Sequence, residues 1–167
     1  PVLPSHHYAH LLAFGEYHGG AIEAAMENFL KYCPPAGDGV DKMIADFAKN
    51  GQRVSGFGHR LYETDPRTVR LVQIARELGF YGKYVKFAEN CEAKLSANGK
   101  RLPLNIDGII AALLLEMDFN PKVGKGVFII ARTPGLVAHV VEEALREKPV
   151  RRLADSDVEY DGPRPRK

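Results

Sequence analysis

The chain has 167 residues, 45% of them hydrophobic and 26% charged, and a formal net charge of +2. This apolar content is enough for one packed core and excludes a disordered chain. The near balance of charge excludes a nucleic-acid surface over the whole chain, and no apolar run is as long as a membrane span.

The hydrophobic pattern predicts a protein built of helices. Apolar residues recur at helical spacing, and proline, glycine or cap residues stand at the ends of each run. These signals predict helices over residues 6–14, 21–30, 40–49, 66–78, 84–96, 103–117 and 123–146. We expect the last helix to be interrupted at Thr133-Pro134-Gly135, because proline removes a backbone donor.

Signals for other structure are weak. Residues 53–57 are the best candidate for a strand, and no internal repeat is visible. The segment after Lys148 is polar and contains three prolines, so it is expected to lie extended on the surface or against a partner chain. The predicted fold class is therefore all-α.

The cysteines and the first residues bear on cellular context. Cys33 and Cys91 lie far apart and in no metal-binding spacing, which fits a reducing compartment better than a disulfide framework. No signal peptide is recognisable, so the expected location is cytoplasmic. The chain starts with Pro-Val-Leu-Pro and no methionine, and we expect it to be part of a longer protein.

Three short segments place a titratable residue beside glycine, at residues 16–21, 54–60 and 104–108. Glycine lets the backbone approach a ligand closely, and nearby helix starts offer free N–H groups to anions. If His18, His59 and Asp107 came together, they would form an acid–base group. Asp107 stands within an apolar run, where burial would raise its basicity and suit it to remove a carbon-bound proton.

Plainer interpretations exist for each of these residues. A histidine near glycine often makes only structural hydrogen bonds, and an aspartate before glycine often caps a helix or turn. His6 and His10 would share a helix face beside His7, but no nearby carboxylate or cysteine completes a metal site, so none is expected. The basic end at 164–167 is interpreted as a solvated terminus.

Five motifs resemble the citrate synthase family in order and approximate spacing. They are His18-Gly19-Gly20-Ala21, Gly56-Phe57-Gly58-His59-Arg60, Asp65-Pro66-Arg67, Asn105-Ile106-Asp107 and Ala131-Arg132-Thr133-Pro134-Gly135. The resemblance runs from about residue 5 to 163. It implies a helical fold whose small domain spans residues 19–108, with parts of the large domain at 1–18 and 109–167.

The resemblance also implies roles for individual residues. Asp107 would remove a proton from the acetyl-CoA methyl group, His18 would hydrogen-bond the thioester oxygen, and His59 would polarise the oxo group of oxaloacetate. Arg67 and Arg132 would hold substrate carboxylates in bidentate contacts. The coenzyme A site would be lined by Val54, Ser55, Gly56, Phe57, Gly58, Leu104 and Asn105.

The implied partners are acetyl-CoA or citryl-CoA, oxaloacetate or citrate, and a second copy of the chain in a homodimer. Coenzyme A enters as the substrate thioester, and no permanently bound cofactor is expected. Neither nucleic acid nor a membrane is an expected partner.

Two departures from the family bear on the direction of the reaction. The loop from His59 to Arg67 is one residue shorter than in typical citrate synthases. Those enzymes carry Arg-Pro-Arg shortly before a Tyr-x-Gly, whereas this chain has the acidic segment 155–157 there. Like charges would repel a tricarboxylate at this position. The candidates to replace the missing arginine are Arg151, Arg152, Arg164 and Arg166.

The acidic tail and the segment 104–110 instead resemble the citryl-CoA lyase module of ATP-citrate lyase and its stand-alone bacterial relatives. In that direction His59 would take the hydroxyl proton and Asp107 would return a proton to the departing enolate. His18, however, is a synthase-like feature. The resemblance therefore favours a citryl-CoA lyase, with a citrate or 2-methylcitrate synthase as the alternative. A non-catalytic module that binds coenzyme A is the rival from another class.

Overall fold

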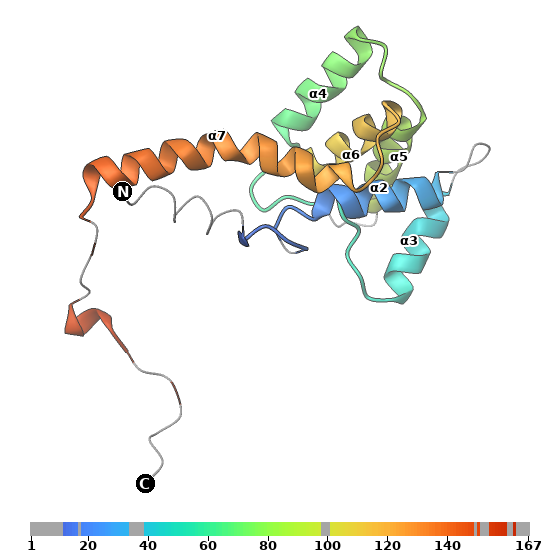
Figure 1. Ribbon diagram of the computed structural model, residues 1–167. Coiled ribbons are helices and arrows are strands. Elements are labelled where there is room, and N and C mark those ends of the chain that lie inside the picture. Colours follow the sequence, from blue (N-terminus) through green and yellow to red (C-terminus); the bar gives the residue numbers. More distant parts are fainter. Residues whose placement is uncertain are drawn as a thin grey trace.

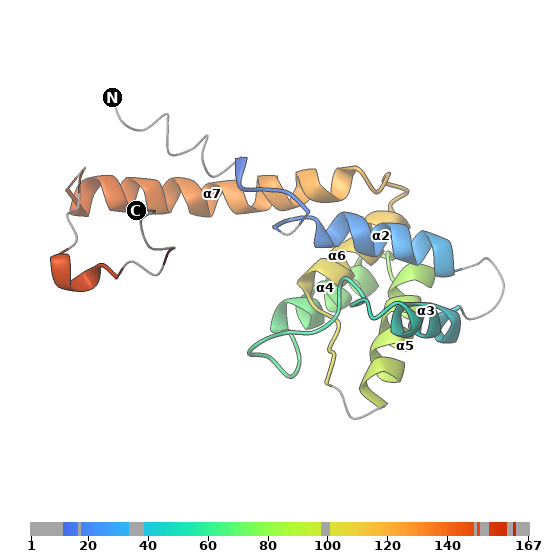
Figure 2. The same cartoon turned by 90° about the horizontal axis from the view of Figure 1, so that it is seen from below.

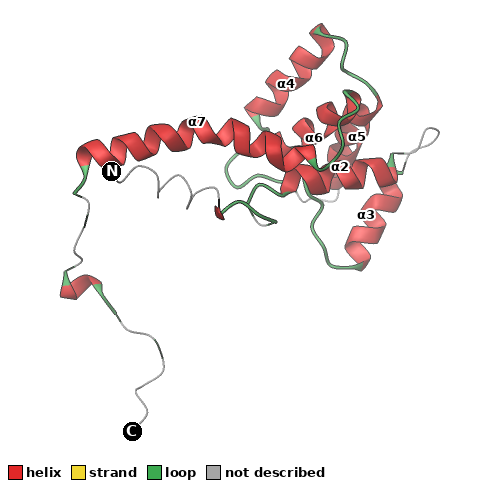
Figure 3. Cartoon of the chain, in the orientation of Figure 1, coloured by secondary structure: helices red, strands yellow, loops and turns green. Residues whose placement is uncertain are grey.

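The computed structural model describes residues 12–16, 18–33, 39–97, 101–148, 150, 154–159 and 162. The predicted all-α class is confirmed within these residues, which contain helices and no strand (Figure 3). The helices are α2 (Ala21–Tyr32), α3 (Val40–Lys49), α4 (Pro66–Glu77), α5 (Lys83–Ala97), α6 (Ile106–Glu116), α7 (Val123–Arg146) and the short 3-10 helix η1 (Asp155–Asp157). None of them is both long and apolar enough to cross a membrane.

Helices α2 to α6 form one body with α6 at its centre (Figures 1 and 2). The sequence of α6 is apolar on nearly every side, so this helix is stable only where other helices surround it. Ile109 and Ala112 of α6 have no exposed surface, nor do Met26 and Phe29 of α2. The core therefore lies between α2, α5 and α6, and the first turn of α6 meets the loop that follows α3.

The predicted strand at 53–57 is wrong, because this segment is a loop that makes a single antiparallel bridge, from Phe57 to Leu104. Gly56 and Gly58 flank the bridge with φ angles of 91° and 90°. These left-handed conformations end any extended pairing after one residue, and they suit glycine because it has no Cβ.

Helix α6 begins three residues later than predicted. Its cap is Asn105, whose side chain accepts hydrogen bonds from the backbone N–H groups of Asp107 at 3.0 Å and Gly108 at 3.1 Å. Residues 103–105 pair with the loop instead. The N–H of Gly58 donates to Pro103 O at 2.7 Å, and that of Asn105 donates to Gly56 O at 3.0 Å.

Helix α7 is continuous, so the predicted interruption at Pro134 is wrong. The missing proline N–H leaves the carbonyl of Ile130 without its helical donor, but Ile130 is 74% exposed and water is available there. The first turns of α7 lie along α2, whereas its second half extends away from the body in both views (Figures 1 and 2). That half carries exposed Val137, Val141 and Leu145.

Predicted features near the two ends of the chain lie partly outside the described residues. The expected helix at 6–14 lies almost wholly outside them, and so do His6, His7 and His10. The acidic tail segment was expected to be extended, but Asp155–Asp157 forms the single turn η1. All four candidate tail arginines lie outside the described residues.

Candidate active site

The first turn of α6 places Asp107 against the loop of residues 54–60, which we call the glycine loop. A Cβ on Gly108 would stand 2.3 Å from the carbonyl oxygen of Gly56, so only glycine permits this approach. The carboxylate of Asp107 is half-buried and accepts no hydrogen bond from any described residue. Burial raises the pKa of Asp107 above its usual value, the positive charges of Arg67 and Arg132 oppose that rise, and the charge of Asp65 adds to it.

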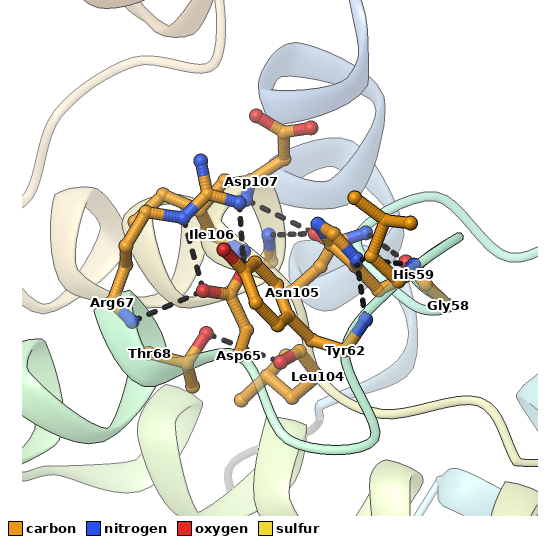
Figure 4. A network of polar contacts seen from close by, with 12 residues as sticks. Gly58, His59, Tyr62, Asp65, Arg67, Thr68, Leu104, Asn105, Ile106 and Asp107 are labelled. Carbon is orange, nitrogen blue, oxygen red and sulfur yellow. Dashed lines mark hydrogen bonds and ion pairs between the residues drawn. The ribbon is translucent and has the colours of Figure 1, made fainter.

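Arg67 is held beside this carboxylate by Asp65. The Nε of Arg67 donates to Asp65 Oδ1 at 2.9 Å, and its Nη2 donates to Oδ2 at 2.8 Å. Figure 4 shows the guanidinium between the carboxylates of Asp65 and Asp107. Asp65 is completely buried, and Arg67 is half exposed. A planar guanidinium that is fixed on one edge and open on the other can bind a further carboxylate in a defined orientation.

His59 has a tautomer set by the backbone. Its Nδ1 accepts hydrogen bonds from the N–H groups of Leu61 and Tyr62, both at 3.0 Å. A neutral ring whose Nδ1 is an acceptor carries its proton on Nε2, so Nε2 is a donor. The ring of Tyr62 packs on His59 with the centroids 4.5 Å apart (Figure 4). The imidazole is thus oriented as a hydrogen-bond donor.

His18 and Arg132 form a second group around Phe128. The His18 ring lies 5.2 Å from Phe14 in a stacked arrangement and 5.5 Å from Phe128 edge-on. The guanidinium of Arg132 lies 4.8 Å from the centre of the Phe128 ring, a cation–π distance. Because Arg132 also acts on the pKa of Asp107, its charge links this group to the carboxylate on α6.

A cavity of about 1090 Å³ opens beside His59, between α3, the end of α5 and the glycine loop. Val54, Phe57 and Gly58 of the predicted coenzyme A site line it, with further apolar side chains from α3 and α5. Arg53, Arg60 and Arg101 also border it. The other four predicted residues are not among its lining. Gly56 and Leu104 are buried, Asn105 caps α6, and Ser55 is half-buried in the same loop.

Several residues that hold the site together were not predicted from the sequence. Asp65 was named only as part of the Asp65-Pro66-Arg67 motif, and its bonds to the Arg67 side chain and to α6 carried no signal in the sequence. Phe128 stands four residues before Arg132, a spacing that places both on one helix face. That spacing was the available signal for Phe128. Tyr62 had none, because its contact with His59 depends on the shape of the short loop.

The comparisons with known proteins agree on one family. Residues 12–153 match the family model described as the citrate synthase C-terminal domain. The chain is similar to the citryl-CoA lyase of Hydrogenobacter thermophilus, with 46% identity and a TM-score of 0.86 over 96% of this chain and 64% of that one. It is 30% identical to the citrate/2-methylcitrate synthase of Bacillus subtilis, over 90% of this chain and 40% of that protein.

A third relative is the ATP citrate lyase of Methanosaeta concilii, solved in complex with (3S)-citryl-CoA. The identity is 26% and the TM-score 0.70, over 92% of this chain and 27% of that one. The chain therefore spans less than two thirds of the length of each of these three relatives.

Proposed function

Because this chain belongs to the citrate synthase family, we propose that it is part of an enzyme acting on the carbon–carbon bond between the acetyl group of acetyl-CoA and oxaloacetate. The direction that we favour is cleavage of citryl-CoA. The observation that carries the proposal is the Asp107 carboxylate, which is half-buried, free of hydrogen bonds among the described residues, and raised in pKa beside Arg67. Such a carboxyl group is suited to exchange a proton with carbon.

In cleavage, the hydroxyl proton of citryl-CoA passes to His59 and the bond between the acetyl methylene and the hydroxyl-bearing carbon breaks. Its electron pair remains on the methylene carbon as an enolate, whose oxygen accepts a hydrogen bond from His18. Asp107, protonated at the start, gives its proton to that carbon, so acetyl-CoA and oxaloacetate result. Arg67 and Arg132 bind substrate carboxylates throughout, and a site closed to water strengthens each of these contacts.

The second candidate is condensation, and the tautomer of His59 favours it. With Nδ1 accepting from Leu61 and Tyr62, the Nε2–H is ready to donate to an oxo oxygen. For cleavage the same nitrogen must begin as an acceptor, which requires the ring to give up the backbone hydrogen bonds at Nδ1. The similarity to a citryl-CoA lyase and the acidic tail favour cleavage instead.

The cavity beside His59 is the place that we propose for coenzyme A. Its apolar wall of Val54, Phe57 and Leu102 suits the adenine ring and the pantetheine chain. Arg53 and Arg60 make no ion pair within the described residues, so both are free to meet phosphates. Arg101, which also lines the cavity, pairs with Glu63.

We propose the small domain at 19–108 between large-domain parts at 1–18 and 109–167, a homodimer, and a cytoplasmic location. A family member that binds coenzyme A without turnover remains the rival from another class. It would retain the cavity and its arginines and would not need the raised pKa of Asp107.

The direct test uses the complete protein in two assays. In one, acetyl-CoA and oxaloacetate are supplied and thiol release is followed; in the other, citryl-CoA is supplied and oxaloacetate is measured. We expect oxaloacetate to form from citryl-CoA faster than thiol is released in the first assay. The reverse result would make the protein a synthase. Silence in both assays, with coenzyme A still bound, would support the non-catalytic module.

A further inference from the structure

Asp65 stands apart from the other charged residues in its burial. Among the described aspartate, glutamate, lysine, arginine and histidine residues it is the one with no exposed surface. A buried carboxylate is costly unless hydrogen bonds replace its lost hydration. Burial alone would raise the pKa of Asp65, but the hydrogen bonds and charge of Arg67 and the N–H of Ile106 outweigh it and lower that pKa below its usual range.

Capping of α4 does not explain this arrangement. A cap needs one oxygen that accepts from the first turn, and the bond from the Arg67 N–H to Asp65 Oδ1 at 3.0 Å meets that need. Three further donors point at the same carboxylate. Two belong to the Arg67 guanidinium, and the third is the N–H of Ile106, 3.1 Å from Oδ2. Three of the four hydrogen bonds that the Asp65 carboxylate accepts are therefore not needed to cap α4.

These extra partners belong to, or directly adjoin, two groups that the proposed reaction uses. Arg67 is the carboxylate binder, and Ile106 is the residue directly before Asp107. Asp65 lies between them in Figure 4, with Thr68 and Asn105 close by. We propose that Asp65 is a positioning residue, which holds the Arg67 guanidinium and the first turn of α6 as one unit and so fixes the spacing between carboxylate binder and base. This inference rests on the proposed function.

The charge of Asp65 also affects the pKa of Asp107. The charged groups that face Asp107 are Arg67 from α4, Arg132 from α7 and Asp65 itself. Asp65 neutralises much of the Arg67 charge and adds a negative charge near the base. Without it, the two arginines would lower the pKa of Asp107 and make that carboxylate a weaker base.

The test is Asp65→Asn in the complete protein, because asparagine is as good a helix cap and nearly the same size. We expect kcat/KM to fall about tenfold to a hundredfold, as a small misplacement of a reacting group does, and in the condensation assay KM should rise more for oxaloacetate than for acetyl-CoA. The pH profile should also move to lower pH. In the condensation assay, where Asp107 must be ionised, the acid limb of the profile should move to lower pH. In the cleavage assay, where Asp107 must be protonated, the basic limb should do so.

The matched control is Thr68→Val. Thr68 is also buried in α4, and its hydroxyl donates to Leu104 O at 3.1 Å, so it joins α4 to the segment just before α6 without a hydrogen bond to the Arg67 side chain. We expect this variant to lose thermal stability while its pH profile stays in place. A pH profile and KM for Asp65→Asn that equal those of Thr68→Val would overturn the inference and leave Asp65 as a structural cap.

Two further outcomes are separable. If Asp65→Asn does not fold by circular dichroism, Asp65→Glu keeps the charge but lengthens the side chain, and the inference then requires a fall in kcat with little shift in pH. An unchanged kcat in a folded Asp65→Glu variant would overturn it. If the wild type is silent with both substrate sets and binds neither citrate nor oxaloacetate, the proposed function fails, and this inference fails with it.

Discussion

The two halves of the candidate site are held by different forces. Around α6, the Asp65 carboxylate accepts four hydrogen bonds, two of them from the Arg67 guanidinium, Asn105 caps the turn that carries Asp107, and two backbone N–H groups donate to His59. Around Phe128, His18 and Arg132 make ring and cation–π contacts, and no side-chain hydrogen bond or ion pair with any described residue. We call these the hydrogen-bonded half and the aromatic half.

The difference separates what is built in advance from what can adjust. Hydrogen bonds are directional and a buried ion pair is costly to rearrange, so the hydrogen-bonded half holds its geometry before substrate arrives. Ring contacts tolerate rotation and small shifts and are worth only about 0.5–1.5 kcal/mol each. We therefore expect His18 and Arg132 to move when substrate binds, while Asp107 and Arg67 stay.

The largest effect is expected from Asp107→Asn in the hydrogen-bonded half. Removal of the group that exchanges a proton with carbon should lower kcat by about a hundredfold to ten thousandfold. The fold and the binding of coenzyme A should survive, because the carboxylate supports no neighbour among the described residues. Turnover that stays near the wild-type rate would exclude Asp107 as the acid or base.

The same variant has an opposite effect on stability. A raised pKa means that the ionised carboxylate opposes folding, so wild-type stability falls as pH rises through the folded-state pKa of Asp107. At neutral pH the midpoint of thermal unfolding of Asp107→Asn should lie above that of the wild type. The difference should vanish in acid, where Asp107 is protonated. A midpoint below that of the wild type at neutral pH would contradict this.

The two arginines give a matched comparison between the halves. Arg67→Gln leaves Asp65 buried without its ion pair and should cost about 3 kcal/mol of unfolding free energy, at the low end for a broken buried pair because Arg67 is half exposed. Arg132→Gln loses its contact with Phe128 and its attraction to Asp107, and it should cost about 1 kcal/mol or less. Both variants should raise KM for the oxo acid. Equal losses of stability in urea unfolding would refute the distinction.

The glycines sharpen the comparison further. Gly108→Ala would push a methyl group into the backbone of Gly56, and we expect a loss of about 1–3 kcal/mol, as for other overpacked sites. Gly135→Ala on α7 meets no atom within 4 Å and should gain up to about 1 kcal/mol from higher helix propensity. Thermal unfolding of both variants measures the difference, and a stable Gly108→Ala would show that α6 can shift away from the loop.

The smallest effect belongs to Phe128→Leu in the aromatic half. Leucine keeps an apolar side chain but removes the ring that His18 and Arg132 share, so the loss should be about 1 kcal/mol. Activity should fall by about tenfold or less, because both side chains are expected to reach substrate in the closed site without that ring. A hundredfold fall in kcat/KM would mean that the aromatic half is as rigid as the other.

Sequence alone predicted the elements whose signals are local. The helices α2, α3 and α5 were expected within two residues of their ends, because apolar periodicity and glycine or proline breaks lie within each segment. The start of α6 was missed because residues 103–105 pair with the loop 56–58, more than forty residues away. The same distance hid the bond between Asp65 and Ile106. Candidate residues were found by type, but their supports lie at positions that only the fold brings together.

The second half of α7, which carries Pro134, has a consequence for amide hydrogen exchange. The second half of α7 extends from the body, and a helical stretch of that length is marginal in water without a covering surface. The amides of residues 136–146 should exchange with deuterium much faster than those of α6 whenever that stretch is bare. Their slowing would mark the moment at which another polypeptide surface covers it, so exchange at these amides would report on assembly independently of the chemistry at Asp107.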